Sequence, residues 1–332
     1  MKRFRIRTML SMAATAALSV ALTVGAAGHL SAQDYPSKPI TIVVPFPPGG
    51  STDLLARQIA EKIAGPLGQP VVVENRGGAG GTVGANHVAH AKPDGYTLLM
   101  GVTGSNAISA VLRDDLPYDP LKNFSPVSVV VSAPLVLVVN ADRPEKSAKD
   151  YIASASAKPG TITHGSPGVG TSMHLTGELF ALESKTKLVH VPYKGSAAAL
   201  QDLLGGQLNS MFGDVLVTAE HVKSGRLRAL AVTSKERHFM MPEVPTVAEA
   251  ALPGFEASSW QGVFAPAGTP EPILTKLHGE IAKALKAEDM QKFFADRGFM
   301  VDGRTPSESK SFIEDEIKKW KRVVDEAGLK VK

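Results

Sequence analysis

The sequence predicts an α/β protein of two lobes, in which parallel strands are covered by helices. Short β-rich runs alternate with helical patterns along most of the chain, which is typical of parallel sheets with helices on both faces. The 332 residues, 43% of them hydrophobic, are enough for about two domains of ~150 residues. No low-complexity linker separates the halves. We therefore expect strands that cross between the lobes, an arrangement that permits hinge motion.

The N-terminus has the three parts of a secretory signal peptide. Met1–Arg7 carries four basic residues, and Met9–Gly28 is apolar, rich in small residues and uncharged. We expect a signal peptide of residues 1–32 with cleavage near Ala32, although Leu30 is larger than the residue usual three positions before a cleavage site. The alternative is an anchoring helix, since ~20 residues can span a bilayer.

The positive charge of the chain comes from this N-terminal segment. The whole sequence has 36 Lys and Arg residues against 32 Asp and Glu residues, and four of the basic residues lie before position 8. Without residues 1–32 the formal charge is zero, so the protein lacks the positive field that attracts nucleic acid or anionic lipid. The absence of cysteine excludes disulfides and Cys-ligated metals. We expect an exported, soluble protein that binds no nucleic acid.

The individual elements follow from hydrophobic runs and their spacing. Predicted strands are Ile40–Val44, Val71–Val73, Tyr96–Met100, Val127–Val131, Leu135–Val139, Thr161–His164, Leu188–Val191, Leu208–Phe212 and Leu227–Val232. Predicted helices include Leu54–Ile63, a stretch ending at Ala91, Thr171–Leu182, Ala197–Leu204, Val215–Lys223, Pro270–Gly298 and Ser307–Ala327. The last helix is amphipathic, because Ile313, Ile317, Trp320 and Val324 recur at i, i+4, i+7 and i+11.

Two glycine-rich loops each follow a predicted strand and open a helix. They are Pro45–Asp53 (PFPPGGSTD) and Gly165–Ser172 (GSPGVGTS). Ligands of open α/β sheets bind at this edge, where glycines let backbone N–H groups approach and helix N-termini favour anions. Neither loop contains Lys or Arg, so a carboxylate held there could also leave. Either loop alone could be purely structural, and Asp53 could cap its helix or contact a ligand.

Motifs for catalysis, cofactors and metals are incomplete. Ser166 lies in HGSPG, which lacks the first glycine of G-x-S-x-G. Gly78–Val83 has valine where the dinucleotide motif has its last glycine. His87 and His90 share a predicted helix but have no third ligand nearby. His174, just after the second loop, could pack or reach a cleft. We expect no catalysis, no cofactor and no metal.

Several short motifs, taken in order, carry a family resemblance. They are Tyr35–Ile40 (YPSKPI), Val43–Asp53 (VVPFPPGGSTD), Val73–Gly84 (VENRGGAGGTVG), Pro93–Leu99 (PDGYTLL), Val191–Gly195 (VPYKG) and Gly262–Pro266 (GVFAP). Over essentially its whole length the chain resembles the solute receptors of tripartite tricarboxylate transporters, often called Bug receptors. The resemblance implies a two-lobed periplasmic binding protein fold of the Venus-flytrap type. It implies lobe one at 36–135 plus 262–332 and lobe two at 136–261.

The resemblance also implies which residues line the ligand cleft. Lobe one would contribute two sets, from the first loop and from a TGSNA motif: Phe46, Gly49, Gly50, Ser51, Asp53, Ser105 and Asn106. Lobe two would contribute Ser166, Gly170, Thr171 and Ser172. Asp214 would close the site and accept hydrogen bonds from a ligand hydroxyl or ammonium group, or from water.

The expected function is that of a periplasmic receptor without catalytic activity. Such a receptor captures a small organic acid and delivers it to the membrane permease subunits of a tripartite transporter. A monomer is expected, because the lobes must open and close. The alternatives are a ligand-loaded sensor or orphan receptor, and an exported hydrolase using Ser51, Ser166 or Ser172. The ligand stays open among citrate, C4 or C5 dicarboxylates, acidic amino acids and aromatic carboxylates.

Overall fold

The computed structural model describes residues 35–331. The description below concerns the compact unit that begins at Lys38. The predicted signal peptide, residues 1–32, and its cleavage site near Ala32 lie outside the described residues. Between residues 35 and 331, no helix has both the length and the apolar character needed to cross a membrane.

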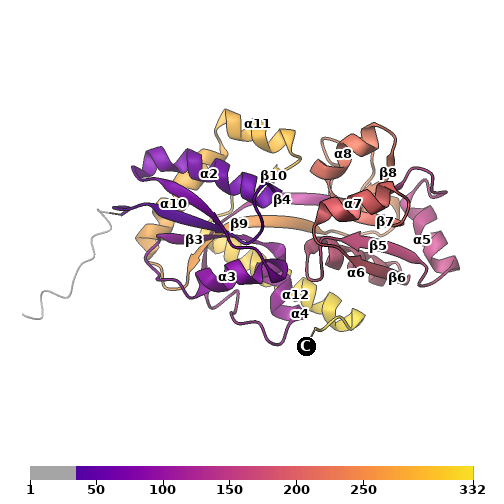
Figure 1. Ribbon diagram of the computed structural model, residues 1–332, viewed down its shortest axis with the longest axis horizontal. Helices are drawn as coiled ribbons and strands as arrows, with labels where there is room; N and C mark the ends of the chain where they lie inside the picture. The colour runs from indigo at the N-terminus through magenta and orange to yellow at the C-terminus, as the bar shows by residue number, and fades with distance from the viewer. Residues whose placement is uncertain (1–34, 332) are drawn as a thin grey trace, which may run out of the picture. The chain divides into compact units, whose positions relative to one another are not determined.

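Ten strands form one connected sheet (Figure 1). They are β1 Ile40–Val44, β2 Val71–Asn75, β3 Thr97–Val102, β4 Phe124–Asn140, β5 Ile162–Ser166, β6 Leu188–Pro192, β7 Ser210–Asp214, β8 Leu227–Val232, β9 Ser258–Pro266 and β10 Met300–Val301. The strand order is β2-β1-β3-β9-β4-β7-β5-β6, and β8 and β10 also pair with β4. Strands β1, β2, β3, β9 and β10 join the sheet along the N-terminal part of β4, and β5 to β8 join it along the C-terminal part. These two groups, with the helices between their strands, are called the first and the second lobe below.

Helices connect most of these strands. They are α2 Ser51–Leu67, α3 Thr82–Ala89, α4 Ser109–Leu112, α5 Ala148–Ala157, α6 Ser172–Glu183, α7 Ser196–Leu204, α8 Val215–Lys223, α9 Val247–Ala250, α10 Glu271–Leu285, α11 Glu288–Asp296 and α12 Pro306–Ala327, with the 3-10 turn η2 Ala79–Gly81 and the π-helical turn η3 Gly104–Ile108. In the first lobe α2 and α10 pack together on one side, while α3 and α12 lie on the other (Figure 1).

The expectation of parallel sheets is right at the outer strands and wrong at the centre. Strands β2-β1-β3 are mutually parallel, as are β6-β5-β7. Strand β9, by contrast, is antiparallel to both β3 and β4, and β4 is antiparallel to β7 and β8. The reason is that β4 carries the chain into the second lobe and β9 carries it back, side by side (Figure 1), and antiparallel neighbours need no helical crossover.

Strand β4 is one continuous strand, so the prediction of two separate strands at 127–131 and 135–139 is wrong. Residues up to Pro134 pair with β9, and residues from Leu135 onward pair with β7. A proline cannot donate to a sheet ladder, and here it lies where β4 changes its partner. Strand β9 was not predicted, because its polar and glycine positions weaken the apolar pattern.

The C-terminal helices differ from the prediction in one respect. The predicted helix 270–298 is two helices, because Ala287 adopts an extended conformation between α10 and α11. Glu288 and Asp289 stabilise the new N-terminus. Helix α12 begins at Pro306, one residue before the predicted start, and its N-terminus has a capping box formed by Thr305 and Glu308.

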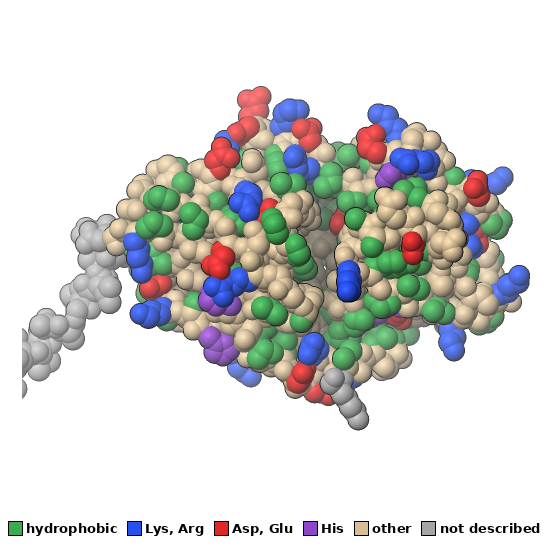
Figure 2. Space-filling model, viewed as in Figure 1, with side chains coloured by type: hydrophobic (Ala, Val, Ile, Leu, Met, Phe, Trp, Pro, Cys, Tyr) green, Lys and Arg blue, Asp and Glu red, His purple; other side chains and the backbone are tan. Residues whose placement is uncertain are grey.

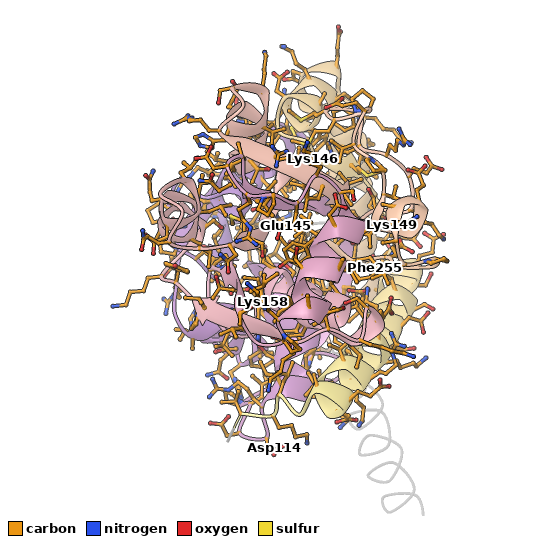
Figure 3. All side chains as sticks on the ribbon, turned by 90° about the vertical axis from the view of Figure 1, so that its right-hand side faces the viewer. Asp114, Glu145, Lys146, Lys149, Lys158 and Phe255 are labelled. Atoms are coloured by element: carbon orange, nitrogen blue, oxygen red, sulfur yellow. The ribbon has the colours of Figure 1, made fainter. Side chains whose placement is uncertain are left out.

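The far end of the second lobe is closed by α5 (Figure 3). Exposed Lys146, Lys149 and Lys158 surround this helix in the view along the sheet. The Glu145 carboxylate, buried just before α5, accepts a 2.6 Å hydrogen bond from Arg143. This end of the second lobe therefore has lysines on its surface and an ion pair between Arg143 and the buried Glu145 next to the start of α5.

Candidate functional site

The first glycine-rich loop leads from β1 into the N-terminus of α2. Gly49 has a φ of +89°, a left-handed conformation that favours glycine. Gly50 is the N-cap with an ordinary φ of −78°, and its carbonyl accepts the first intrahelical bond, from Leu54. The N–H groups of Ser51 and the two residues after it therefore precede the helical hydrogen bonds and are available to an anion.

Asp53 is the anchor of this loop. Its carboxylate accepts hydrogen bonds from the Gly49 N–H at 2.9 Å, from Arg57 at 2.9 and 3.0 Å, and from Asn75 at 2.8 Å. Asn75 also donates to the Phe46 carbonyl at 3.1 Å. Burial opposes ionisation, but these donors hold the pKa of Asp53 below its ordinary value. With both carboxylate oxygens satisfied, Asp53 shapes the loop from within.

Arg57 and Asn75 are functional candidates that sequence reasoning did not single out. The i,i+4 spacing of Asp53 and Arg57 on one helix is a signal that could have found the first. Asn75 lies 22 residues from Asp53, and only the pairing of β1 with β2 brings it to the loop.

The second loop joins β5 to α6. Gly170 has a φ of +81° and is buried. Thr171 is the N-cap of α6; its hydroxyl accepts from the His174 N–H at 3.4 Å and donates to the Gly168 carbonyl at 2.8 Å. Ser172 begins the helix and is buried. This loop repeats the arrangement of the first one: a strand end, left-handed glycine and a helix N-terminus.

Ser166 and the TGSNA motif at residues 103–107 are buried. The Ser166 hydroxyl contacts Nε2 of His190 at 2.6 Å. Ser105 and Asn106 lie in η3 and are fully buried, and the Ser105 hydroxyl donates to Asn106 Oδ1 at 2.6 Å. Asn106 Nδ2 is buried without a hydrogen-bond partner among the described residues. Such a group needs a ligand or water to satisfy it.

Close approaches of glycine backbone bring the loops of the two lobes together. A Cβ atom built on Gly81 would lie 3.4 Å from Phe46 and 3.5 Å from Ser105, so these first-lobe residues are neighbours. A Cβ atom on Gly104 would lie 3.1 Å from the carbonyl oxygen of Gly170 in the second lobe. Figure 2 shows the surface hollowed between the two lobes.

Asp214 lies at the carboxyl end of β7, opposite Leu135 of β4. It is the N-cap of α8 but makes no side-chain capping hydrogen bond. Burial raises the pKa of Asp214 to about 6. A desolvated carboxyl group at a strand end, without a charged partner that lowers its pKa, is a functional-site candidate.

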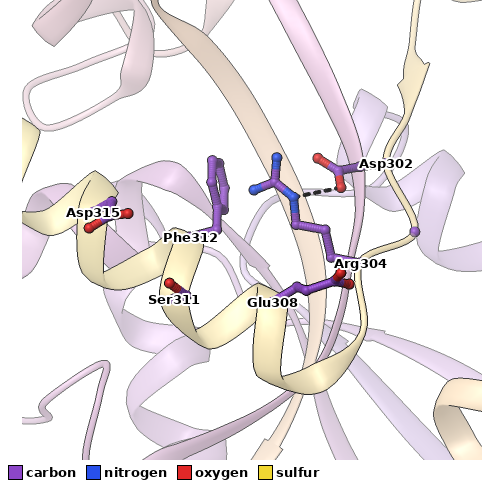
Figure 4. A pocket seen from close by; sticks show the side chains of 7 residues that line it. Asp302, Arg304, Glu308, Ser311, Phe312 and Asp315 are labelled. Carbon is purple, nitrogen blue, oxygen red and sulfur yellow. Dashed lines mark ion pairs between the residues drawn. The ribbon is translucent and has the colours of Figure 1, made fainter.

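A surface pocket of about 530 Å³ lies elsewhere, beside α12 (Figure 4). It is lined by Asp302, Gly303, Arg304, Glu308, Ser311, Phe312 and Asp315. Arg304 pairs with Asp302 at 2.9 Å and lies 3.7 Å over the Phe312 ring. The acidic side chains in this lining outnumber its one basic side chain, Arg304, which already pairs with Asp302. The pocket is therefore unsuited to a carboxylate ligand. Within residues 35–331, no group of three or more His, Asp and Glu side chains is arranged to hold a metal ion.

The chain matches a known receptor family by sequence. Residues 55–329 match the model described as the tripartite tricarboxylate transporter family receptor. The chain is similar to Protein BugT of Bordetella pertussis (strain Tohama I), with 42% identity over 311 residues, covering 93% of this chain and 95% of BugT.

Solved structures agree with this assignment. An R. palustris protein solved with adipate is 36% identical, with a TM-score of 0.81 and coverage of 89% of this chain and 99% of that one. MatC from Rhodopseudomonas palustris with bound malate is 35% identical, with a TM-score of 0.79 and coverage of 87% and 100%. The periplasmic binding protein BugD is 34% identical, with a TM-score of 0.79 and coverage of 89% and 99%. The chain therefore belongs to the tripartite tricarboxylate transporter receptor family and is a solute-binding receptor with a two-lobed periplasmic binding protein fold.

Proposed function

We propose that this receptor binds a small organic acid between its lobes and delivers it to the permease subunits of a tripartite transporter. The observation that carries the proposal is the position of the second glycine-rich loop against the TGSNA motif, where a Cβ atom built on Gly104 would lie 3.1 Å from the Gly170 carbonyl oxygen. The first loop lies beside the same motif, because a Cβ atom on Gly81 would lie 3.4 Å from Phe46 and 3.5 Å from Ser105. Each loop opens a helix, and neither contains a cation of its own. Two relatives were solved with adipate and malate, which supports a dicarboxylate ligand.

The proposed site uses backbone groups for the carboxylate and side chains for selectivity. The residues that we assign to it are Phe46, Gly49, Gly50, Ser51, Ser105, Asn106, Ser166, Gly170, Thr171, Ser172 and Asp214, with Asp53 as the anchor of the first loop. N–H groups at the starts of α2 and α6 bind the carboxylate. A ligand that contacts both lobes stabilises the closed state by its differential affinity for it.

The remaining parts of the proposal concern assembly and location. We assign 36–135 plus 262–332 to lobe one and 136–261 to lobe two. The basic and apolar start of the sequence supports export to the periplasm with removal of residues 1–32. A monomer suits a receptor whose two lobes must separate to release the ligand.

Thermal unfolding with a carboxylate panel tests the binding site. Protein lacking residues 1–32 is stripped of ligand by partial unfolding, refolded and mixed with malate, adipate, citrate, glutamate and benzoate. A ligand at ~100 times its dissociation constant adds ~2.7 kcal/mol of stability, which corresponds to several degrees. One clear shift in the unfolding temperature supports the proposal. If the protein has refolded and none of these acids shifts its unfolding temperature, the proposal is contradicted.

Gly50→Ala locates the ligand within the structure. The Cβ atom would meet nothing within 4 Å and φ is ordinary, so the fold tolerates the change while the ligand loses its close approach. Gly65→Ala is the matched control, because Gly65 lies in the same helix with equally open space. Equal ligand shifts in the two variants would remove the first loop from the site.

Delivery to a permease is tested in cells. A deletion strain should lose uptake of the identified acid and regain it with the wild-type gene. Retained uptake, together with a lost transcriptional response to the acid, would favour the sensor alternative.

The contact between Ser166 and His190 is the one observation that fits a hydrolase. It lacks the third member of a triad, because Glu178, the nearby carboxylate, lies against His164 and His174 instead. Ester hydrolysis that disappears in Ser166→Ala would establish this second function.

A further inference from the structure

Three histidine rings lie stacked directly beneath the second loop. His164 comes from β5, His174 from α6 and His190 from β6. The ring centroids of His174 and His190 are 3.8 Å apart, and those of His164 and His190 are 5.0 Å apart. His164 and His174 are at least 95% buried, so the stack is part of the lobe interior.

Two of these rings hold the loop by hydrogen bonds. Nδ1 of His174 accepts the Gly170 N–H at 3.3 Å. Nε2 of His190 lies 2.6 Å from the Ser166 hydroxyl, which also contacts the carbonyl and N–H of Gly168 at 3.0 and 3.2 Å. The second loop is thus held against the stack at Ser166, near its start, and at Gly170, near its end.

The hydrogen bond from Gly170 fixes the protonation of His174. Since Nδ1 accepts, the proton of the neutral ring is on Nε2, which faces Glu178 Oε1 at 3.6 Å. Nε2 of His164 lies 3.4 Å from the same oxygen. A second proton on His174 would place an N–H of the ring against the Gly170 N–H and remove that hydrogen bond.

We infer that His174 and His190 are positioning residues of the ligand site, which hold Gly170 and Ser166 in the binding conformation, and that the hydrogen bond to Gly170 lasts only while the His174 ring is neutral. This inference rests on the proposed function, because it assigns a role to residues of the proposed cleft. It explains why the cation-free second loop rests on His174 and His190, two imidazoles that burial keeps uncharged.

The surroundings of the rings favour the neutral form. Burial, together with a smaller effect of the neighbouring imidazoles, lowers the pKa of both His174 and His190 to about 3. Glu178 acts in the opposite direction on His174. In the part of the chain that the structure describes, the titratable groups facing the stack are its own three rings and Glu178. The loop therefore stays organised at neutral pH and loosens only in acid.

Paired substitutions at His190 separate positioning from mere packing. His190→Gln keeps a polar group for Ser166, whereas His190→Leu fills the space without one; His87→Gln on the exposed surface of α3 is the control. Binding of malate and adipate is measured by calorimetry at pH 8 and pH 5. We expect His190→Leu to weaken binding about tenfold, the worth of one net hydrogen bond, and His190→Gln and His87→Gln to bind almost as wild type does. Wild-type affinity in His190→Leu would overturn the inference.

A ligand-free measurement keeps this test separate from the proposed function. Nitrogen-15 NMR of the wild-type protein should show His174 neutral with its proton on Nε2 from pH 8 to pH 5, and an unchanged Gly170 amide resonance. In His190→Leu, which removes one neighbouring imidazole, the pH at which His174 protonates should rise, and the Gly170 amide should shift with it. A His174 ring protonated at pH 6 in the wild type, or a Gly170 amide indifferent to His174 protonation, overturns the inference. If neither acid binds the wild type, the ligand proposal fails while these NMR results still decide the role of the rings.

Discussion

The Thr233 hydroxyl lies 2.7 Å from the carbonyl oxygen of Ala257 and donates a hydrogen bond to it. The same hydroxyl accepts the N–H of Leu135 at 2.9 Å. Leu135 lies where β4 enters the second lobe, and Ala257 precedes the return strand β9. One fully buried side chain therefore ties both strand crossings together.

Thr233→Val should destabilise the protein by about 1–3 kcal/mol, because the Leu135 N–H and the Ala257 carbonyl lose a buried partner. Urea unfolding measures the change in the free energy of unfolding. Thr269→Val serves as the comparison, since its hydroxyl bonds only a local carbonyl, that of Pro266. A smaller loss at Thr233 than at Thr269 would show that the crossing does not depend on this hydroxyl.

Asp53→Asn should weaken ligand binding about tenfold, ~1.4 kcal/mol, because an amide group would face the donors that now hold the loop. Calorimetry with the acid identified in the panel gives the affinity. Arg76→Gln is a suitable control, since Arg76 pairs with Glu74 at the exposed surface. If Asp53→Asn binds normally, the loop does not need its anchor.

The contribution of Asp53 to the free energy of unfolding should depend on pH in a defined direction. Its pKa is lower in the folded state, so the carboxylate stabilises the fold above its ordinary pKa. That stability is lost as the pH falls through the folded pKa. The difference in unfolding free energy between wild type and Asp53→Asn should therefore shrink as the pH is lowered from 7 toward 3. A difference that grows in acid would contradict the assignment.

Asp214→Asn should stabilise the protein at pH 8. The pKa of Asp214 is raised from 3.8 to about 6 by burial, so the ionised carboxylate costs stability above pH 6 and not below pH 4. The gain is at most roughly 2–3 kcal/mol at 1.36 kcal/mol per pKa unit, measured by urea unfolding at pH 8 and pH 4. Exposed Asp142→Asn should show no such pH-dependent gain. An equal effect of Asp214→Asn at both pH values would exclude the carboxyl charge as the cause.

Glu316→Ala should be among the more destabilising substitutions in α12. One carboxylate oxygen accepts the indole N–H groups of Trp260 and Trp320, each at 3.0 Å. Truncation leaves two buried donors unpaired, at a cost of about 2–4 kcal/mol. Glu316→Gln keeps an acceptor and should lose less, and the exposed Glu326→Ala should be nearly neutral. Thermal unfolding of the three variants would show whether this order holds.

The candidate site was predictable to the extent that it is local in sequence. Each glycine-rich loop and the helix start that follows it are specified by a stretch of about ten residues. Short stretches suffice because strand ends and helix starts follow from short-range backbone preferences. Which loop residue faces a ligand is not local. In the sequence, Asp53 could cap its helix or contact a ligand. In the structure, the pairing of β1 with β2 brings Asn75 close enough to donate a hydrogen bond to the Asp53 carboxylate, which anchors the first loop.

By itself the sequence determined the alternation of strands and helices, the two helix-opening loops and the amphipathic α12, because hydrophobic period and turn residues act over short stretches. Only the tertiary structure decided that β4 is one strand serving both lobes, that β9 returns beside it, and that His190 lies against Ser166. These relations join residues that are far apart in the chain, and they depend on how the strands pair and how the side chains pack between them.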